Sequence, residues 1–304
     1  MAEGVVLRPP TLDDAGPVAE VLNAEARRLR GRDDVDERAV RGWWTQPPPF
    51  DRERDVVVAL RDGRVVGYGD VADQANDGSV LWLDVRGDAM DEVLAELERR
   101  ARERRAPSGV VRAVADERDA GYKALLERRG YRPIRASYRM TIDLESATLA
   151  PRWPAGAGAR TATGGVDEPL LHDLAQRSFA DHWGFTSTPY EEWLHWLREI
   201  GEYDPTLCFV ADHDGVPAGV VIGRVRGHGV DAQGWVSVLG VLPEHRGLGL
   251  GTALLVTAFA EHRRRGLTRG GLGVDAENTT GAVRLYERAG MTVAERQDIW
   301  ELGS

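Results

Sequence analysis

An internal repeat constrains the fold of this chain more than any other feature of its sequence. Residues 56–71, VVVALRDGRVVGYGDV, resemble residues 208–223, CFVADHDGVPAGVVIG, and Gly67 matches Gly219 at an offset of 152. Each segment predicts two strands joined by an Asp-Gly turn, which is typical of a β-hairpin. The sequence therefore predicts two structural units built on one plan.

A second match supports the two-unit plan. Residues 114–133 resemble residues 274–293 at an offset of 160. Each unit also opens with a short strand and an amphipathic helix, and the Ala-, Pro- and Gly-rich stretch between the units reads as a linker. We therefore expect two α+β units, each a mixed and mostly antiparallel sheet flanked by helices, over residues 1–145 and 159–304, with a linker at 146–158.

Length, charge and cysteine usage limit the classes of function. The chain has 304 residues, a formal net charge of −10 and one cysteine, Cys208. A single cysteine excludes an internal disulfide and a cysteine-based metal site, and we expect no metal. The acidic balance is unlike the basic footprint of nucleic-acid-binding proteins. The sequence has no signal-like start and no apolar run of about 20 residues. We expect a cytoplasmic protein that binds neither nucleic acid nor a membrane, as a monomer or a homodimer.

Residues 241–255, VLPEHRGLGLGTALL, place three glycines at alternate positions between a predicted strand and a predicted helix. Backbone N–H groups at a helix start form an anion site when no side chain obstructs them, and the helix dipole adds to it. Arg246 adds a forked guanidinium suited to phosphate oxygens. This glycine loop therefore predicts a pyrophosphate site, and a purely structural turn is the alternative.

Two common pyrophosphate motifs fit the glycine loop poorly. A nucleoside triphosphatase would have GxxxxGK[ST], and the loop has no lysine. A dinucleotide-binding fold would have GxGxxG, whereas Gly247, Gly249 and Gly251 give GxGxG. Asp275, after the next predicted strand, keeps a dinucleotide-dependent oxidoreductase as a minor hypothesis.

The segment downstream of the loop carries a resemblance to a known family. NTTGAVRLYERAG at 278–290 begins about 27 residues after the last loop glycine. Together with VLPEHRGLGLG, it resembles the acyl-CoA loop and the following helix of GCN5-related N-acetyltransferases, the GNAT superfamily. The resemblance covers residues 158–304 strongly and residues 1–145 in outline. The tandem arrangement and SFADHWG resemble the mycothiol-synthase-like subgroup.

The resemblance implies two tandem GNAT folds, of which the second transfers an acetyl group from acetyl-CoA to the primary amine of a small molecule, an amino-sugar or amino-acid conjugate. In the family, the loop backbone binds the pyrophosphate and the preceding strand pairs with the pantetheine arm. Asn278 would also fix its loop and cap the next helix, and Gly240 suits a close backbone approach. The implied acetyl-CoA-binding residues are Leu239, Gly240, Val241, Arg246, Gly247, Leu248, Gly249, Leu250, Gly251, Thr252 and Asn278.

Tyr286 is the implied catalytic acid, because family members use a tyrosine here to protonate the departing thiolate. A phenol near pKa 10 suits a thiol near 8.5, and aromatic packing is the alternative role. The attacking amine needs a base, but QGWVSVLGV at 233–241 has Trp235 and Ser237 where the family has a glutamate. The base stays open among Asp181, His182, Asp231 and water.

The segment DHWGFTSTPYEEWLHWLREIGEYD at 181–204 would set acceptor specificity in this family. Its composition suits a small amine with an apolar or sugar-like body, although helix packing explains part of it equally well. The residues concerned are Trp183, Phe185, Tyr190, Trp193, Trp196, Asp181, Glu191, Glu192 and Glu202.

The first unit lacks the features that bind acetyl-CoA. Its loop has one glycine, Gly87, among the acids Asp84, Asp88 and Asp91. Leu126 stands at the position of the tyrosine and Arg118 at that of the asparagine. We expect this unit to serve as a scaffold and one wall of the substrate site, with Trp43 and Trp44 either in that wall or in the core. A non-catalytic acyl-CoA-binding sensor is the alternative to an enzyme.

Overall fold

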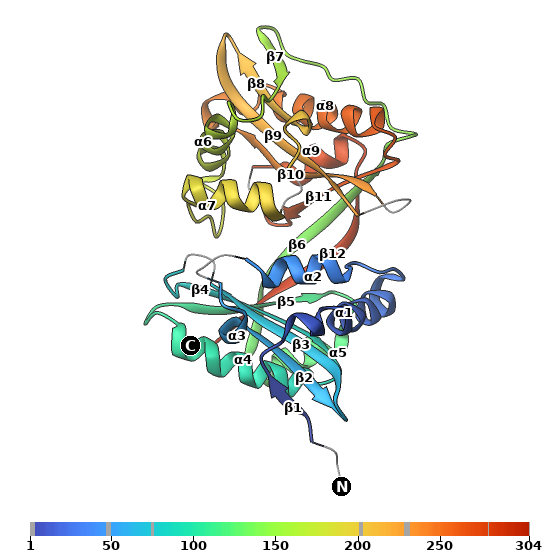
Figure 1. Ribbon diagram of the computed structural model, residues 1–304. Coiled ribbons are helices and arrows are strands. Elements are labelled where there is room, and N and C mark those ends of the chain that lie inside the picture. Colours follow the sequence, from blue (N-terminus) through green and yellow to red (C-terminus); the bar gives the residue numbers. More distant parts are fainter. Residues whose placement is uncertain are drawn as a thin grey trace. The chain divides into compact units, whose positions relative to one another are not determined.

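The computed structural model describes residues 4–46, 50–73, 76–200, 203–227, 232–278 and 280–303, with backbone only at 199–200. The chain forms two compact units (Figure 1). Unit 1 comprises Met1–Arg135 and Gln297–Ser304, and unit 2 comprises Ala136–Arg296. No helix of the described residues is long and apolar enough to cross a membrane, and their acids, histidines and cysteine form no group of three suited to a metal ion.

Unit 1 is a mixed sheet with helices on both faces. Helices α4 and α5 pack on one face, and α1 and α2 on the other, because Val57 and Ala59 point to the first core while Val56 and Val58 point to the second. The strands, in sheet order, are β1 (Val6–Arg8), β2 (Val56–Arg61), β3 (Arg64–Asp73), β4 (Val80–Gly87), β5 (Val110–Asp116) and the end of β12 (Thr292–Leu302). The helices are α1 (Ala15–Arg30), α2 (Glu37–Trp44), α3 (Arg52–Asp55), α4 (Met90–Arg104) and α5 (Ala120–Arg128).

Unit 2 repeats this architecture. Its helix α8 packs on one face, beside α9, while α6 packs on the other. The strands, in sheet order, are β6 (Tyr131–Asp143), β11 (Arg269–Asp275), β10 (Gln233–Val241), β9 (Val216–Arg226), β8 (Cys208–His213) and β7 (Ala157–Thr161). The helices are α6 (Glu168–Phe179), α7 (Tyr190–His195), α8 (Leu250–Arg264) and α9 (Ala282–Arg288). The predicted α+β class with helix-flanked mixed sheets is confirmed.

The predicted hairpins are also confirmed, as β2–β3 and β8–β9. In both turns the Asp and the Gly have positive φ, at 52° and 74° for Asp62 and Gly63 and at 52° and 81° for Asp214 and Gly215. Two successive residues with positive φ give a turn whose twist matches that of the flanking strands, and Asp-Gly tolerates this conformation well. The repeat therefore reflects one hairpin built twice.

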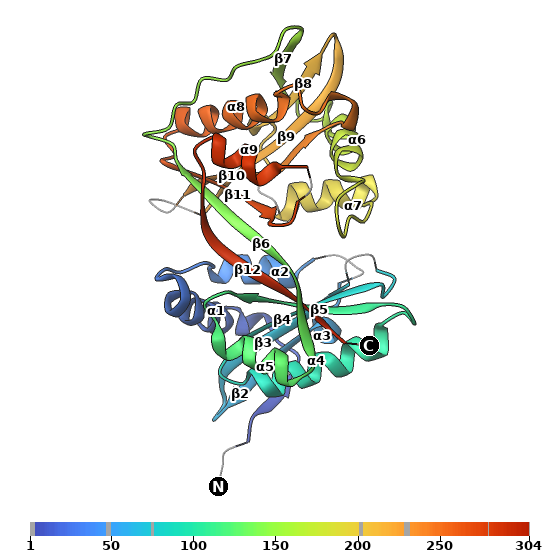
Figure 2. The ribbon, with the colours of Figure 1, turned by 180° about the vertical axis from the view of Figure 1, so that it is seen from behind.

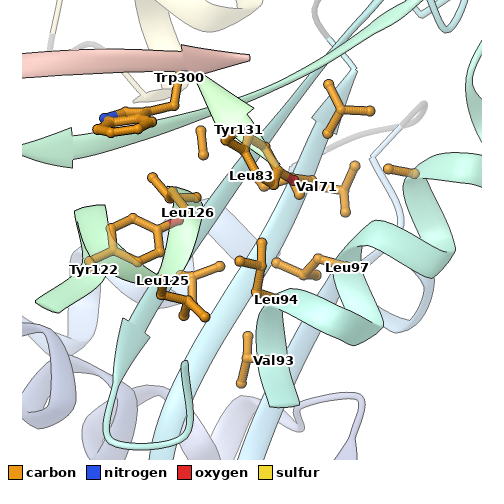
Figure 3. Packing of buried hydrophobic residues seen from close by; sticks show 14 of the residues in the cluster. Val71, Leu83, Val93, Leu94, Leu97, Tyr122, Leu125, Leu126, Tyr131 and Trp300 are labelled. Carbon is orange, nitrogen blue, oxygen red and sulfur yellow. The ribbon is translucent and has the colours of Figure 1, made fainter. Parts of the chain in front are cut away.

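The last strand of each half belongs partly to the other unit, which the sequence ranges 1–145 and 159–304 do not anticipate. Residues Ser137–Asp143 of β6 pair with β11 of unit 2, and residues Gln297–Glu301 of β12 pair with β5 of unit 1 (Figure 2). Trp300, near the end of the chain, fills the unit 1 core beside Leu126 and Tyr131 (Figure 3). The two halves therefore exchange strands.

The expected linker is packed rather than free. Leu149 is buried and Trp153 is half-buried against the unit 2 core. Arg263 of α8 also donates hydrogen bonds to the carbonyl oxygens of Leu144, at 3.4 Å, and Ala147, at 3.0 Å. In unit 1, Trp44 is buried and stacks on Tyr68 with ring centroids 6.3 Å apart, so its place is in the core.

Candidate functional site

The glycine loop leads from β10 into α8 through backbone that favours glycine. Gly247 and Gly249 have φ of 79° and 92°, in the left-handed region that other residues avoid. Gly249 is the N-cap of α8, and no side chain caps this helix end in the described part of the chain. The first N–H groups of α8 therefore remain donors, and the space around both glycines is open. This arrangement suits an anion.

Gly251 has a different role from the other two glycines. It lies inside α8, where an added Cβ would stand 3.2 Å from Leu285 Cδ1 and 3.6 Å from Val241 Cγ2. The glycine lets α9 approach α8, because a Cβ would press against Leu285. The missing side chain of Gly251 thus serves helix packing, while its backbone N–H, in the first turn of α8, stays among the predicted pyrophosphate donors.

Strand β10 separates from β11 just before the loop. The parallel pairing covers only Gly234–Val236, which face Gly270–Leu272. On its other edge β10 stays paired with β9 as far as Val241, with a register shift between Val236 and Val238. The edge of β10 that faces β11 is thus open from Val238 onward among the described residues. Leu239, Gly240 and Val241, the residues expected to pair with a ligand arm, lie on this open edge.

Arg246 is anchored by the protein itself. Its guanidinium donates to both carboxylate oxygens of Asp181, at 2.6 and 3.0 Å, and to the backbone oxygens of Ser178, at 2.9 Å, and Val241, at 3.2 Å. These contacts hold the glycine loop against the end of α6. Its hydrogen bond with Arg246 lowers the pKa of Asp181, which makes this carboxylate a weak base.

His182 is the candidate base with the more suitable surroundings. Its ring is half-buried against Phe179, with ring centroids 4.5 Å apart. Burial lowers its pKa, and the charge of Arg246 acts in the same direction, while Asp181 and Asp275 act in the opposite direction. A neutral imidazole at pH 7 can accept a proton. Asp231, the third candidate, lies outside the described residues.

Tyr286 is buried on α9, with 8% of its surface exposed. Burial raises its pKa to about 12, so the phenol keeps its proton at neutral pH. Within the described residues its hydroxyl forms no hydrogen bond. A protonated and unengaged hydroxyl is what a proton donor requires.

Asn278 does not cap α9, which corrects the expectation for this residue. The N-cap is Gly281, in the left-handed region at φ 80°. The Asn278 side chain instead accepts a hydrogen bond from the Thr280 backbone N–H at 2.8 Å. Asn278 therefore closes the turn before the helix, and it fixes the loop as expected.

The acceptor segment divides into packed and exposed aromatics. Tyr190 and Trp193 surround His172, with ring centroids 5.6 and 5.3 Å from it. Trp183 and Trp196 are exposed, at 40% and 45%. Phe185 and Glu192 are half-buried and Glu191 is exposed. Glu202 lies outside the described residues.

Trp235 and Ser237 differ in their surroundings on β10. The guanidinium groups of Arg139 and Arg226 each lie 5.0 Å from the centre of the Trp235 ring. Ser237 is exposed at the register shift. Neither residue supplies a carboxylate, so β10 itself provides no strong base.

The repeat identifies the same place in unit 1. Gly67 of β3 pairs with Gly87 of β4, and its repeat equivalent Gly219 of β9 pairs with Val241 of β10. Gly87 and Val241 therefore match, and so do the residues just before them. Arg86 therefore stands where unit 2 has Gly240. Pairing of β4 with β5 also ends early, at Leu83, so unit 1 retains the strand opening.

The helices that face these openings correspond as well. Asp14 accepts two hydrogen bonds from Arg8 of β1, and Asp167 accepts two from Arg160 of β7. Eleven residues further along the chain stand Glu25 on α1 and Ser178 on α6. Glu25 of unit 1 thus occupies the position of Ser178.

In unit 1 the residues at these two matching positions form an ion pair. Arg86 Nη1 donates to Glu25 Oε1 at 2.8 Å, and Arg86 Nη2 lies 2.8 Å from Asp84 Oδ1. In unit 2 the corresponding pair is Ser178 and Gly240, which are small. The side chain of Leu126, at the position of Tyr286, is fully buried, and Arg118 reaches the backbone oxygen of Leu29 at 3.4 Å. The site features therefore gather in unit 2.

Comparison with known proteins gives consistent relationships. Residues 169–291 match the Acetyltransferase (GNAT) family. A mycothiol acetyltransferase of Stackebrandtia nassauensis is 30% identical over 297 residues, covering 92% of this chain and 93% of that protein. One of Thermobispora bispora is 38% identical over 166 residues, covering 54% of this chain and about half (56%) of that protein. The crystal structure of a GCN5-related N-acetyltransferase from Sphaerobacter thermophilus has a TM-score of 0.82 and 27% identity, covering 98% of this chain and 95% of that chain.

Proposed function

Because this chain belongs to the GNAT family of acetyl-CoA-dependent N-acetyltransferases, we propose that unit 2 acetylates the primary amine of a small molecule, an amino-sugar or amino-acid conjugate. The observation that carries the proposal is the open edge of β10 beside the uncapped start of α8. The edge offers backbone groups to the pantetheine arm, and the helix start offers N–H donors to the pyrophosphate. The mycothiol acetyltransferases among the relatives make mycothiol-related amines the first acceptors to test.

Within this proposal, Tyr286 protonates the departing thiolate. Transfer from a phenol with a pKa of about 12 to a thiolate whose conjugate acid is near 8.5 is uphill by ~5 kcal/mol. A thiolate that forms in the same buried surroundings also has a raised pKa, which narrows the gap. His182 accepts the proton of the amine, directly or through water, and Arg246 with Asp181 holds the loop in place.

A non-catalytic acyl-CoA-binding sensor is the second candidate, since β10 carries no carboxylate. Calorimetry with acetyl-CoA and an assay of CoA release with a panel of amines separate the two. An enzyme binds acetyl-CoA and releases CoA only when an acceptor is present. A sensor gives binding heat and a raised melting temperature but no acetylated amine. If no heat is detected with folded protein, acetyl-CoA binding is excluded and both candidates are lost.

The role of Tyr286 has its own test. Tyr286→Phe keeps the ring and removes the proton, so we expect kcat at saturating amine to fall by about 100-fold, the usual size of a general-acid contribution, with the Kd for acetyl-CoA unchanged. Tyr138→Phe, in a half-buried tyrosine of the same core cluster, is the matched control and should leave kcat unaltered. Unchanged turnover in Tyr286→Phe would assign this residue to packing.

A further inference from the structure

We propose that the Ser178 hydroxyl hydrogen-bonds an amide of the pantetheine arm of the acyl-CoA. The inference rests on the proposed function of unit 2 and adds a binding residue on α6 to a site otherwise built from β10, α8 and α9. Ser178 is the penultimate residue of α6, and only 2% of its surface is exposed.

The hydroxyl of Ser178 has no hydrogen-bond partner in the described protein, although it is buried. A buried hydroxyl without a partner destabilises a folded protein, because it has lost its hydrogen bonds to water. Such groups are rare in folded proteins and call for a physical reason. A ligand that provides the missing partner is one such reason.

The position of the hydroxyl points to that ligand. A Cβ placed on Gly240 would lie 2.8 Å from Ser178 Oγ, so the hydroxyl lies directly against the open part of β10. The backbone oxygen of Ser178 also accepts a hydrogen bond from Arg246 at 2.9 Å, which fixes this end of α6 relative to the glycine loop. The hydroxyl thus lies over the face of β10 at Gly240, a residue of the open edge that the arm would follow. The arm contains two amide groups, each able to bond a hydroxyl.

The repeat supports an external partner. In unit 1 the matching position holds Glu25, whose partner is the chain's own Arg86, at 2.8 Å. In unit 2 the residue matching that arginine is Gly240, which has no side chain to offer. Unit 2 thus keeps a polar side chain, Ser178, on α6 but, within the described residues, has no protein side chain to pair with it. In the proposal, the bound pantetheine arm is the hydrogen-bond partner of Ser178, as Arg86 is the partner of Glu25 in unit 1.

Ser178→Ala tests the proposal because it should make the ligand-free protein more stable and at the same time weaken acetyl-CoA binding. Removal of an unpartnered buried hydroxyl should raise the melting temperature of the ligand-free protein by a few degrees. Loss of the hydrogen bond should raise the Kd for acetyl-CoA about fivefold by calorimetry, with kcat little changed. A merely structural hydroxyl would lower the melting temperature and leave the Kd unaltered.

The matched control is Thr257→Ala on α8. The Thr257 hydroxyl already donates to the Ala253 backbone oxygen at 2.8 Å, so its loss should neither raise the melting temperature nor change the Kd.

A donor series locates the contact on the ligand. With S-acetylpantetheine, which has both amides but no pyrophosphate, kcat/KM should fall about fivefold in Ser178→Ala. With S-methyl thioacetate, which has no amide, it should not change. Equal Kd values for acetyl-CoA in wild type and Ser178→Ala would overturn the proposal. Absence of binding in the wild type itself would instead overturn the function proposed for unit 2.

Discussion

Position 240 has no room for a side chain, because the neighbouring Ser178 occupies the space that a side chain would need. A Cβ at Gly240 would lie 2.6 Å from Ser178 Cβ, which is closer than carbon atoms pack. The sequence alone indicated a glycine with a close backbone approach here. The structure identifies the α6 side chain as one group that makes this approach.

A double-mutant cycle checks this contact. We expect Gly240→Ala to lower the free energy of unfolding by about 1–3 kcal/mol, the usual cost of overpacking. Ser178→Gly removes the obstructing side chain, at a helix cost of about 1 kcal/mol. The double variant should then be more stable than the sum of the two changes predicts, by at least about 1 kcal/mol in urea unfolding. Additive losses would show that the two residues do not constrain each other.

His262 gives unit 2 a pH-dependent stability. The side chain is fully buried on α8 against Gly234, and neither ring nitrogen has a hydrogen-bond partner in the described protein. Burial lowers its pKa from 6.5 to about 4. Between these values the unfolded chain binds the proton and the folded protein does not, so stability falls as the pH falls.

We expect His262 to remove up to about 3 kcal/mol of stability between pH 6.5 and pH 4. Urea unfolding at a series of pH values measures the loss. His262→Leu has no proton to bind, so its stability should decline less over that interval than that of the wild type. Parallel pH profiles for the two proteins would show that His262 does not cause the decline.

Among single residues, the ones recognisable from sequence had backbone or motif signals. Gly247 and Gly249 followed from an alternating glycine pattern, and their positive φ values explain it. Tyr286 followed from its place in a motif. Ser178 was missed, because a serine in an amphipathic helix carries no local sign that its hydroxyl is buried without a partner.

At the scale of elements, the hairpins, the glycine loop and the helix after it followed from sequence, since turn chemistry and hydrophobic periodicity are local. The pairing of the strand before the loop with the pantetheine arm was predicted from the family resemblance alone. The ion pair between Arg86 and Glu25 of unit 1 could not be predicted from the sequence. Glu25 and Arg86 lie 61 residues apart, and nothing in either local pattern announces that they meet. The aspartates around Gly87 had led to the prediction that unit 1 does not bind acyl-CoA, and the ion pair is consistent with that prediction.

At the scale of the whole molecule, the two-unit plan was predictable and the exchange of final strands was not. The last strands of the two halves, β6 and β12, are equivalent in the repeat, because the halves share one fold. Local pattern cannot state which of two similar strands completes which sheet. The structure resolves this through pairing of β12 with β5 and of β6 with β11.

Because the strands are exchanged, a destabilising substitution in β12 should affect unit 1 rather than unit 2. Trp300 is 3% exposed in the core of unit 1, so Trp300→Ala should lower stability by about 3–5 kcal/mol. The rate of hydrogen exchange should rise first in β4, β5 and α5 rather than in α8 or α9, although β4 lies more than 200 residues before Trp300 in the sequence. Val293→Ala, at a 46% exposed position of the same strand, is the control. Faster exchange confined to unit 2 would contradict the assignment of Trp300 to unit 1.

The crossed strands also decide what a protease could do to this protein. A cut within residues 146–158 would yield two fragments, each of which contributes one strand, β6 or β12, to a sheet formed mainly by the other. The two fragments would stay associated after the covalent link was gone, because β12 pairs with β5 in unit 1 and β6 pairs with β11 in unit 2. They would part only when both pairings were lost.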